Sequence, residues 1–179
     1  MTEPLGIYIH IPFCRSKCDY CDFYSLAGCG GEKMDLYQKA LLAHIREAAP
    51  TAADRQVDTV YFGGGTPSYY GAKRLAEVLK TLKKHYRLAK DCEITVEANP
   101  DTADFKTLRA LRRAGANRVS LGVQSACDKE LAALHRVHTF AQAAEAVAAA
   151  RKAKLHNVSL DLIYGLPGQT MAAWQETVE

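Results

Sequence analysis

Three cysteines lie close together near the start of the chain, in the loop between Cys14 and Cys21. Cys14, Cys18 and Cys21 follow the spacing C-x3-C-x2-C. A structural zinc site uses four closed ligands, and a [4Fe–4S] cube has four irons to bind. Three thiolates hold three corners of such a cube and leave the fourth iron open to a small molecule. The spacing therefore predicts an iron–sulfur site that takes part in chemistry.

A zinc knuckle is the alternative for this loop, with His10 or an aspartate as the fourth ligand. Cys29, in a glycine-rich stretch shortly after the loop, is interpreted as a spare thiol rather than a fourth iron ligand. The cations of Arg15 and Lys17 favour deprotonated thiolates next to them. We favour the iron–sulfur interpretation because a glycine-rich turn and several carboxylates accompany the cysteines.

Strand-like and helix-like segments alternate along the sequence that must position this loop. The predicted strands are 5–12, 57–62, 93–98, 118–124 and 157–164. The predicted helices are 33–49, 71–86, 105–114 after an N-cap at Asp104, 128–134, 140–154 and 171–179. This alternation predicts an α/β fold with parallel strands and helical crossovers. An open doubly wound sheet and a closed or partial barrel both fit the pattern.

Polar residues that a hydrophobic core does not need stand at or near the predicted strand ends. They are the run Gly63-Gly64-Gly65-Thr66, Glu97, Gln124 and Asp161. In both candidate folds ligands bind at the carboxyl ends of the strands. Glycines let a ligand approach the backbone, exposed N–H groups bind anions, and a carboxylate accepts hydrogen bonds from ribose hydroxyls. We therefore expect these residues to converge on one polar ligand.

A cationic and histidine-containing segment follows the fourth predicted strand. Arg136 has the fork geometry that pairs with a ligand carboxylate. His135 and His138, on either side of it, are interpreted as surface or packing residues, with axial haem ligation as the alternative.

Composition narrows the class of protein. The chain has 179 residues, 48% of them hydrophobic, and a formal net charge of +3, so it can bury the core of one large domain. The cations between Lys80 and Lys84 are interpreted as a solvated helix face, and we expect no nucleic-acid partner. No run of 18 apolar residues and no signal peptide occur, so we expect a cytoplasmic protein without a membrane span. We expect residues 1–179 to form a single domain, incomplete at its C-terminus.

These motifs resemble the radical S-adenosylmethionine (SAM) superfamily, whose motif is this C-x3-C-x2-C loop after the first strand. They are most similar to the branch that contains oxygen-independent coproporphyrinogen III oxidase and the radical SAM haem chaperone. The resembling runs are residues 8–14, 61–68, 96–100, 120–125, 134–138 and 161–170, in order along nearly the whole chain.

The resemblance implies the front part of a partial (β/α)6 barrel, with about five of its six βα units in this sequence. Cys14, Cys18 and Cys21 would hold a [4Fe–4S] cluster whose open iron takes the amino and carboxylate groups of SAM. An electron from the cluster would cleave the sulfonium C–S bond and give a 5′-deoxyadenosyl radical. The positions that match SAM-contacting residues of the family are Tyr8, Tyr20, Gly64, Gly65, Thr66, Glu97, Gln124, Arg136 and Asp161.

Two functions compete within this branch. The oxidase resembles C-x3-C-x2-C-x-C, but Phe23 stands where its additional cysteine would be. The chaperone form resembles the Cys-Asp-Phe and Arg-x-His runs found here, so we favour a protein that binds haem and delivers it to apo-haemoproteins. The oxidase alternative implies oxidative decarboxylation of porphyrinogen propionates. Either would take electrons from a donor such as flavodoxin or ferredoxin.

Overall fold

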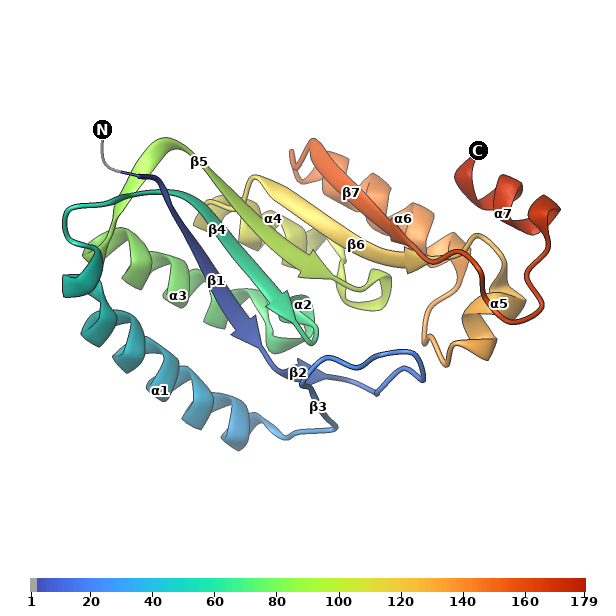
Figure 1. Cartoon of the computed structure of the whole chain (residues 1–179), viewed down its shortest axis with the longest axis horizontal. Coiled ribbons are helices and arrows are strands. Elements are labelled where there is room, and N and C mark those ends of the chain that lie inside the picture. The colour runs from blue at the N-terminus through green and yellow to red at the C-terminus, as the bar shows by residue number, and fades with distance from the viewer. Residues whose placement is uncertain (1–2) are drawn as a thin grey trace.

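A five-stranded sheet organises the computed structural model, which describes residues 3–179. Its strands are β1 (Leu5–Ile11), β4 (Gln56–Gly64), β5 (Arg87–Ala98), β6 (Arg118–Gln124) and β7 (Asn157–Leu162). Each strand pairs in parallel with the next, in the order β1-β4-β5-β6-β7 (Figure 1). The predicted parallel sheet is confirmed. A doubly wound sheet reverses its strand order at a switch point, so this consecutive order is that of a partial barrel.

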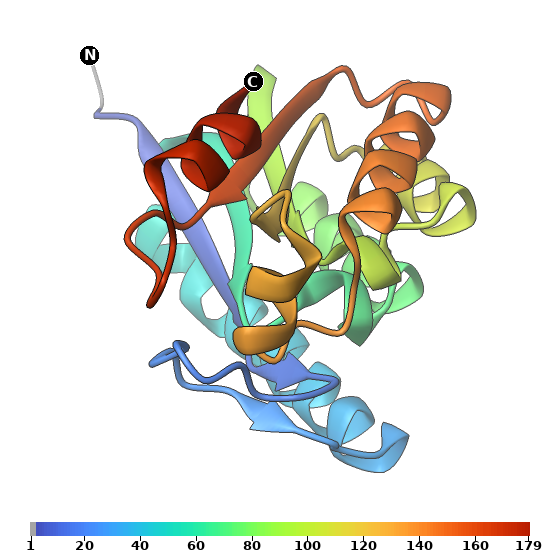
Figure 2. The ribbon, with the colours of Figure 1, turned by 90° about the vertical axis from the view of Figure 1, so that its right-hand side faces the viewer.

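Helices alternate with the strands, and the longer ones lie on one side of the sheet. The α-helices of residues 3–179 are α1 (Gly31–Ala48), α2 (Pro67–Tyr70), α3 (Ala72–His85), α4 (Phe105–Ala114), α5 (Asp128–Ala133), α6 (Phe140–Lys152) and, after the last strand, α7 (Met171–Val178). Figure 2 shows α1, α3, α4 and α6 along the same face of the sheet. Asp104 caps α4 by accepting a hydrogen bond of 2.7 Å from the Thr107 N–H, as its residue type predicts. Within residues 3–179, the helices lack the apolar length that a membrane span requires.

The sequence did not indicate three short elements beside the main sheet. Strands β2 (Phe13–Cys14) and β3 (Leu26–Ala27) pair with each other and enclose the cysteine loop. The single turn of α2 follows the glycine run. These elements are too short to show the periodicity from which helices and strands are predicted.

The hydrophobic core lies between the sheet and its helices. Val60, Phe62 and Val96 are buried in β4 and β5, and α3 places Leu75 and Leu79 in the same core. These strand residues occupy alternate positions, so they share one face of the sheet. The hydrophobic core thus covers one face of the sheet, and the opposite face is not part of it.

The opposite face of the sheet is polar. Tyr61, Glu97, Ser120 and Asp161 come from four successive strands, and all line the same cavity. The strands of all-parallel sheets are usually buried on both faces and read as nearly continuous apolar runs. Alternating polar residues in parallel strands therefore indicate that this face meets a polar ligand instead of a second core.

The glycine run joins the end of β4 to the start of the cysteine loop. Gly65 N–H donates to the Ile11 carbonyl and Thr66 N–H to the Phe13 carbonyl, each at 2.8 Å. A Cβ added to Gly65 would lie 2.9 Å from backbone atoms of both Ile11 and Phe13. A flexible side chain could move away, but these atoms belong to the chain that leads into Cys14.

We predict that Gly65→Ala lowers the free energy of unfolding by about 1–3 kcal/mol, because overpacking here displaces backbone. Gly31→Ala is the matched control, since a Cβ at Gly31 meets nothing within 4 Å. Urea denaturation of both variants measures the difference. Equal stabilities would show that the junction between β4 and the cysteine loop is not tightly packed.

Candidate functional site

A cavity of about 720 Å³ opens at the carboxyl ends of the strands, between the cysteine loop and the polar face of the sheet. Eleven of the twelve predicted site residues line it: Cys14, Cys18, Tyr20, Cys21, Gly64, Gly65, Thr66, Glu97, Gln124, Arg136 and Asp161. Tyr8 is the exception. Its side chain is 56% exposed, bonds to His10 and stacks on Tyr61 with ring centroids 6.1 Å apart. A ligand contact for Tyr8 stays a prediction.

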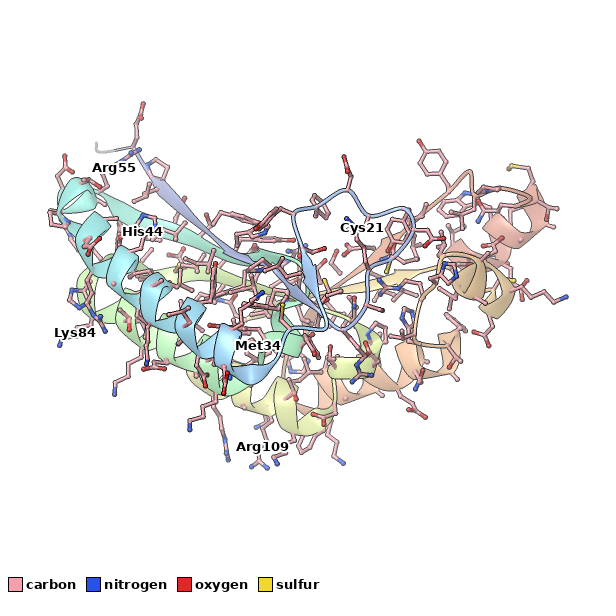
Figure 3. The ribbon with its side chains drawn as sticks, turned by 90° about the horizontal axis from the view of Figure 1, so that it is seen from below. Cys21, Met34, His44, Arg55, Lys84 and Arg109 are labelled. Atoms are coloured by element: carbon pink, nitrogen blue, oxygen red, sulfur yellow. The ribbon has the colours of Figure 1, made fainter. Side chains whose placement is uncertain are left out.

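The three cysteines sit on one loop that begins in β2. Cys21 N–H donates to the Cys18 carbonyl at 3.1 Å, which closes a tight turn between them, and Figure 3 shows Cys21 on this loop. In residues 3–179, no three His, Cys, Asp or Glu side chains converge closely enough to hold one metal ion. All three cysteines line the same cavity, so the loop offers its three thiols to one shared space.

His10 has a role other than the fourth zinc ligand of the alternative interpretation. Its Nε2 donates to the Tyr24 carbonyl at 2.9 Å, and its Nδ1 accepts from the Tyr8 hydroxyl at 3.1 Å. The ring covers Gly64, where a Cβ would lie 2.6 Å from the imidazole. Both ring nitrogens are therefore engaged, and His10 anchors the end of the cysteine loop.

Two of the cysteine sulfurs receive hydrogen bonds from residues far along the chain. Thr66 Oγ1 donates to Cys14 Sγ and Arg136 Nη1 to Cys18 Sγ, both at 3.5 Å. Burial raises the pKa of the Cys14 thiol, whereas the Thr66 hydroxyl lowers it. A thiolate at Cys14 thus depends on nearby donors or on bound cations.

Arg136 ties the cysteine loop to the sheet. Its Nη1 also donates to the Tyr20 hydroxyl at 3.3 Å, and its Nη2 donates to Asn99 Oδ1 at 2.9 Å and to the Gly122 carbonyl at 2.7 Å. Nη1 and Nη2 thus each donate to two acceptors within the protein. A fork between Arg136 and a ligand carboxylate would require exchange of one of these contacts.

Gly122 provides the room for this convergence. A Cβ there would lie 2.8 Å from Gln124 Nε2, 3.2 Å from Asn99 Oδ1 and 3.3 Å from Arg136 Nη2. Gln124 itself has φ = 73°, in the left-handed region that residues other than glycine rarely adopt. The pairing of β6 with β7 shifts register between Gly122 and Gln124. Backbone strain of this kind occurs where a side chain must be aimed at a site.

Glu97 is held at the centre of the polar face. Tyr61 Oη donates to Glu97 Oε1 at 2.7 Å, and Gly64 N–H donates to Oε2 at 3.1 Å. Burial raises the pKa of Glu97, and these two donors oppose that shift. In the neighbouring strands, Ser120 Oγ donates to Asp161 at 2.9 Å. Both carboxylates are thus oriented by the protein toward the cavity.

The expectation that the glycine turn exposes N–H groups to an anion is wrong. Gly64 N–H donates to Glu97, Gly65 N–H to Ile11 and Thr66 N–H to Phe13. Every one of these amides is therefore used within the protein. The turn contributes close packing and the Thr66 hydroxyl rather than an anion-binding nest.

The two histidines beside Arg136 occupy different environments. His138 is only 3% exposed, and its Nε2 donates to the Val123 carbonyl at 3.2 Å. His135 is exposed, and its Nδ1 lies 2.7 Å from the Asp19 carboxylate on the cysteine loop. His138 is thus the packing residue of the sequence interpretation, and its burial leaves it no access to an axial haem position.

Sequence reasoning missed several residues that line the cavity, among them Phe23, Tyr61 and Ser120. A period of two between polar residues in predicted parallel strands would have found Tyr61 and Ser120, because it places them on the face of Glu97 and Asp161. Asn99 lies in the run 96–100 at the end of the third predicted strand, but its contacts with Thr66 and Arg136 join residues distant in the sequence.

Comparisons with known proteins agree with this geometry. The family model "Radical SAM superfamily" matches residues 8–179. The chain is 44% identical over 170 residues to "Heme chaperone HemW" of Mycobacterium tuberculosis and 40% identical over 168 residues to that of Escherichia coli (strain K12), with 94% of this chain covered in each case. The solved structure of coproporphyrinogen III oxidase (HemN) from Escherichia coli superposes with a TM-score of 0.91, at 32% identity over 99% of this chain.

The chain spans less than half the length of these proteins. It covers 44% of each of the two chaperones and 41% of the oxidase chain. The similarity therefore concerns the part of each relative that corresponds to the sheet, the cysteine loop and the cavity.

The buried His138 predicts a pH dependence of stability. Burial, followed by the charge of Arg136, lowers the pKa of His138 below its ordinary value of 6.5. The unfolded chain therefore takes up a proton at this residue that the folded chain resists, so stability decreases as the pH falls below about 6.5. Thermal unfolding at pH 7.5 and 5.5 should show a smaller decrease for His138→Gln than for the natural sequence. Exposed His44→Gln is the control, and an equal decrease in all three proteins would contradict the assignment to His138.

Proposed function

The chain belongs to the radical SAM superfamily, and from this premise we propose that it binds a [4Fe–4S] cluster and SAM and acts as a haem chaperone. The main support is its similarity to curated haem chaperones, 44% and 40% identical over nearly all of this chain. Phe23 agrees with this choice, because the oxidase pattern has a cysteine at that position.

The residues on the cavity wall fit these cofactors. Cys14, Cys18 and Cys21 offer three thiolates around a shared space, and Thr66 and Arg136 place hydrogen-bond donors on two of the sulfurs. When bound, the cluster supplies the electron that breaks a sulfonium C–S bond of SAM. The chain's own part is to fix both groups in place and to exclude water around them.

Opposite the cysteines, the polar face of the sheet offers groups for SAM. We assign the ribose hydroxyls to Glu97 and Asp161, whose carboxylates are held by Tyr61 and Ser120. Gln124, turned by its left-handed backbone, and the Tyr20 ring complete the lining with Gly64, Gly65, Thr66 and Arg136. These roles follow from the chemistry of each group and its place in the cavity.

Haem and apo-haemoproteins are the partners that the chaperone function requires, with flavodoxin or ferredoxin as the class of electron donor. A cytoplasmic location agrees with six free cysteines, because reducing compartments keep such thiols reduced. The second candidate is oxygen-independent coproporphyrinogen III oxidase, favoured by the TM-score of 0.91 to that enzyme.

The cluster assignment predicts that substitutions of different cysteines have very different effects on the amount of bound iron and sulfide. Serine at Cys14, Cys18 or Cys21 removes one thiolate ligand, so anaerobic reconstitution should give little bound iron and acid-labile sulfide. Cys29→Ser is the matched control, because Cys29 does not line the cavity, and it should keep the full content of both. Stoichiometric zinc without sulfide in the natural sequence would instead support a zinc knuckle.

Haem and coproporphyrinogen III distinguish the two candidate functions. The reconstituted full-length protein is given SAM and dithionite without oxygen, and each compound is offered separately. Stable haem binding, detected by its visible absorption, with no consumption of coproporphyrinogen III is the expected result. Formation of protoporphyrinogen IX would favour the oxidase and contradict the chaperone.

A further inference from the structure

A continuous chain of hydrogen bonds runs from Arg136 to Cys14. Arg136 Nη2 donates to Asn99 Oδ1 at 2.9 Å, and Asn99 Nδ2 donates to Thr66 Oγ1 at 3.3 Å. Thr66 Oγ1 in turn lies 3.5 Å from Cys14 Sγ. The same guanidinium donates directly to Cys18 Sγ through Nη1 at 3.5 Å. One positive charge is thereby connected to two of the three cysteine sulfurs.

The chemistry of the groups fixes the direction of this chain. A guanidinium only donates, so Asn99 must present its oxygen to Arg136 and its NH2 group to Thr66. The Thr66 hydroxyl accepts from that NH2 group, which leaves its own proton free to point at Cys14. Hydrogen bonds aligned in this way polarise one another and strengthen the last donor.

The surroundings hold this orientation. Thr66 is 4% exposed, so water competes little for its hydroxyl. Asn99 N–H is bound to Ser68 Oγ at 3.3 Å, which fixes the backbone from which the amide projects. Among the hydrogen bonds of residues 3–179, Asn99 is the one side chain bonded to both Arg136 and Thr66.

We propose that Asn99 is a positioning residue that raises the reduction potential of the cluster by directing the Thr66 hydroxyl at Cys14. The proposal rests on the proposed function, since it assumes that the cysteines hold the cluster. Reduction adds one electron, supplied by the external donor, and increases the negative charge on the sulfur ligands. Hydrogen bonds to those sulfurs stabilise the reduced form more than the oxidised form.

Two substitutions interrupt the series of hydrogen bonds from Arg136 to Cys14 at different residues. Thr66→Val keeps the shape of the side chain and removes the hydroxyl. Asn99→Asp keeps an acceptor for Arg136 but has no N–H for Thr66, so the hydroxyl turns from Cys14 to the new carboxylate. For both variants we expect the ratio of reduced to oxidised cluster at a fixed potential to fall about tenfold, which for one electron is a midpoint shift of about 59 mV.

The measurement is a redox titration of the reconstituted full-length protein with dithionite, followed by electron paramagnetic resonance of the reduced cluster. Thr66→Ser retains a hydroxyl and should restore a midpoint near that of the natural sequence. Thr95→Val is the matched control, because Thr95 is a buried threonine of β5 whose hydroxyl donates to Glu93 and does not line the cavity.

The outcomes separate this proposal from the one it rests on. If the natural protein takes up no cluster, the proposed function fails and this inference with it. If clusters form but Thr66→Val and Asn99→Asp keep the natural midpoint, or shift no more than Thr95→Val, the inference alone is overturned. If Thr66→Val loses its cluster, the midpoint of Asn99→Asp alone tests the inference: a lowered midpoint supports it and an unchanged midpoint overturns it. Should both variants lose it, Thr66 and Asn99 are needed to hold the cluster rather than to set its potential, and the inference is overturned.

Discussion

The Arg136 guanidinium is the interaction on which the rest of the site depends. It reaches a sulfur and a hydroxyl of the cysteine loop, Cys18 and Tyr20, and the polar groups Asn99 and Gly122 at the sheet edge. Cys18 and Arg136 are 118 positions apart in the sequence. The guanidinium presents five N–H donors in a rigid, planar fork, whereas a lysine ammonium presents three on a flexible stem. This contact makes the loop and the sheet two walls of the same cavity.

Close packing makes that contact possible. Gly122 leaves room for Asn99, Gln124 and Arg136 at one point, and Gly65 brings the glycine run against the backbone that leads into Cys14. The hydrophobic core between the strands and α3 holds the opposite face of the sheet rigid. The polar face is thereby free to carry Glu97 and Asp161, each oriented by a neighbouring hydroxyl. The sheet thus carries the carboxylates of the site, the cysteine loop carries its thiols, and the helices complete the core behind the sheet.

Much of this could be read from the sequence because the signals are local. Apolar periodicity located the main strands and helices, and Asp104 marked the start of α4 by its side-chain chemistry. The rule that ligands meet the carboxyl ends of parallel strands brought Glu97, Gln124 and Asp161 together correctly. The use of the glycine amides, the role of His10 and the contacts of Asn99 depend on pairs distant in the sequence. No local pattern records such pairs, and the short β2–β3 pairing is invisible for the same reason.

We propose that Cys14, Cys18 and Cys21 leave one iron of a cube open to SAM within this cavity. Mössbauer spectroscopy of the full-length protein, reconstituted with 57Fe and measured with and without SAM, tests it most directly. The account predicts that the signal of a single iron site changes when SAM is added while the other irons keep theirs. A spectrum in which every iron is unaffected by SAM, or in which no cubane signal occurs at all, would contradict it.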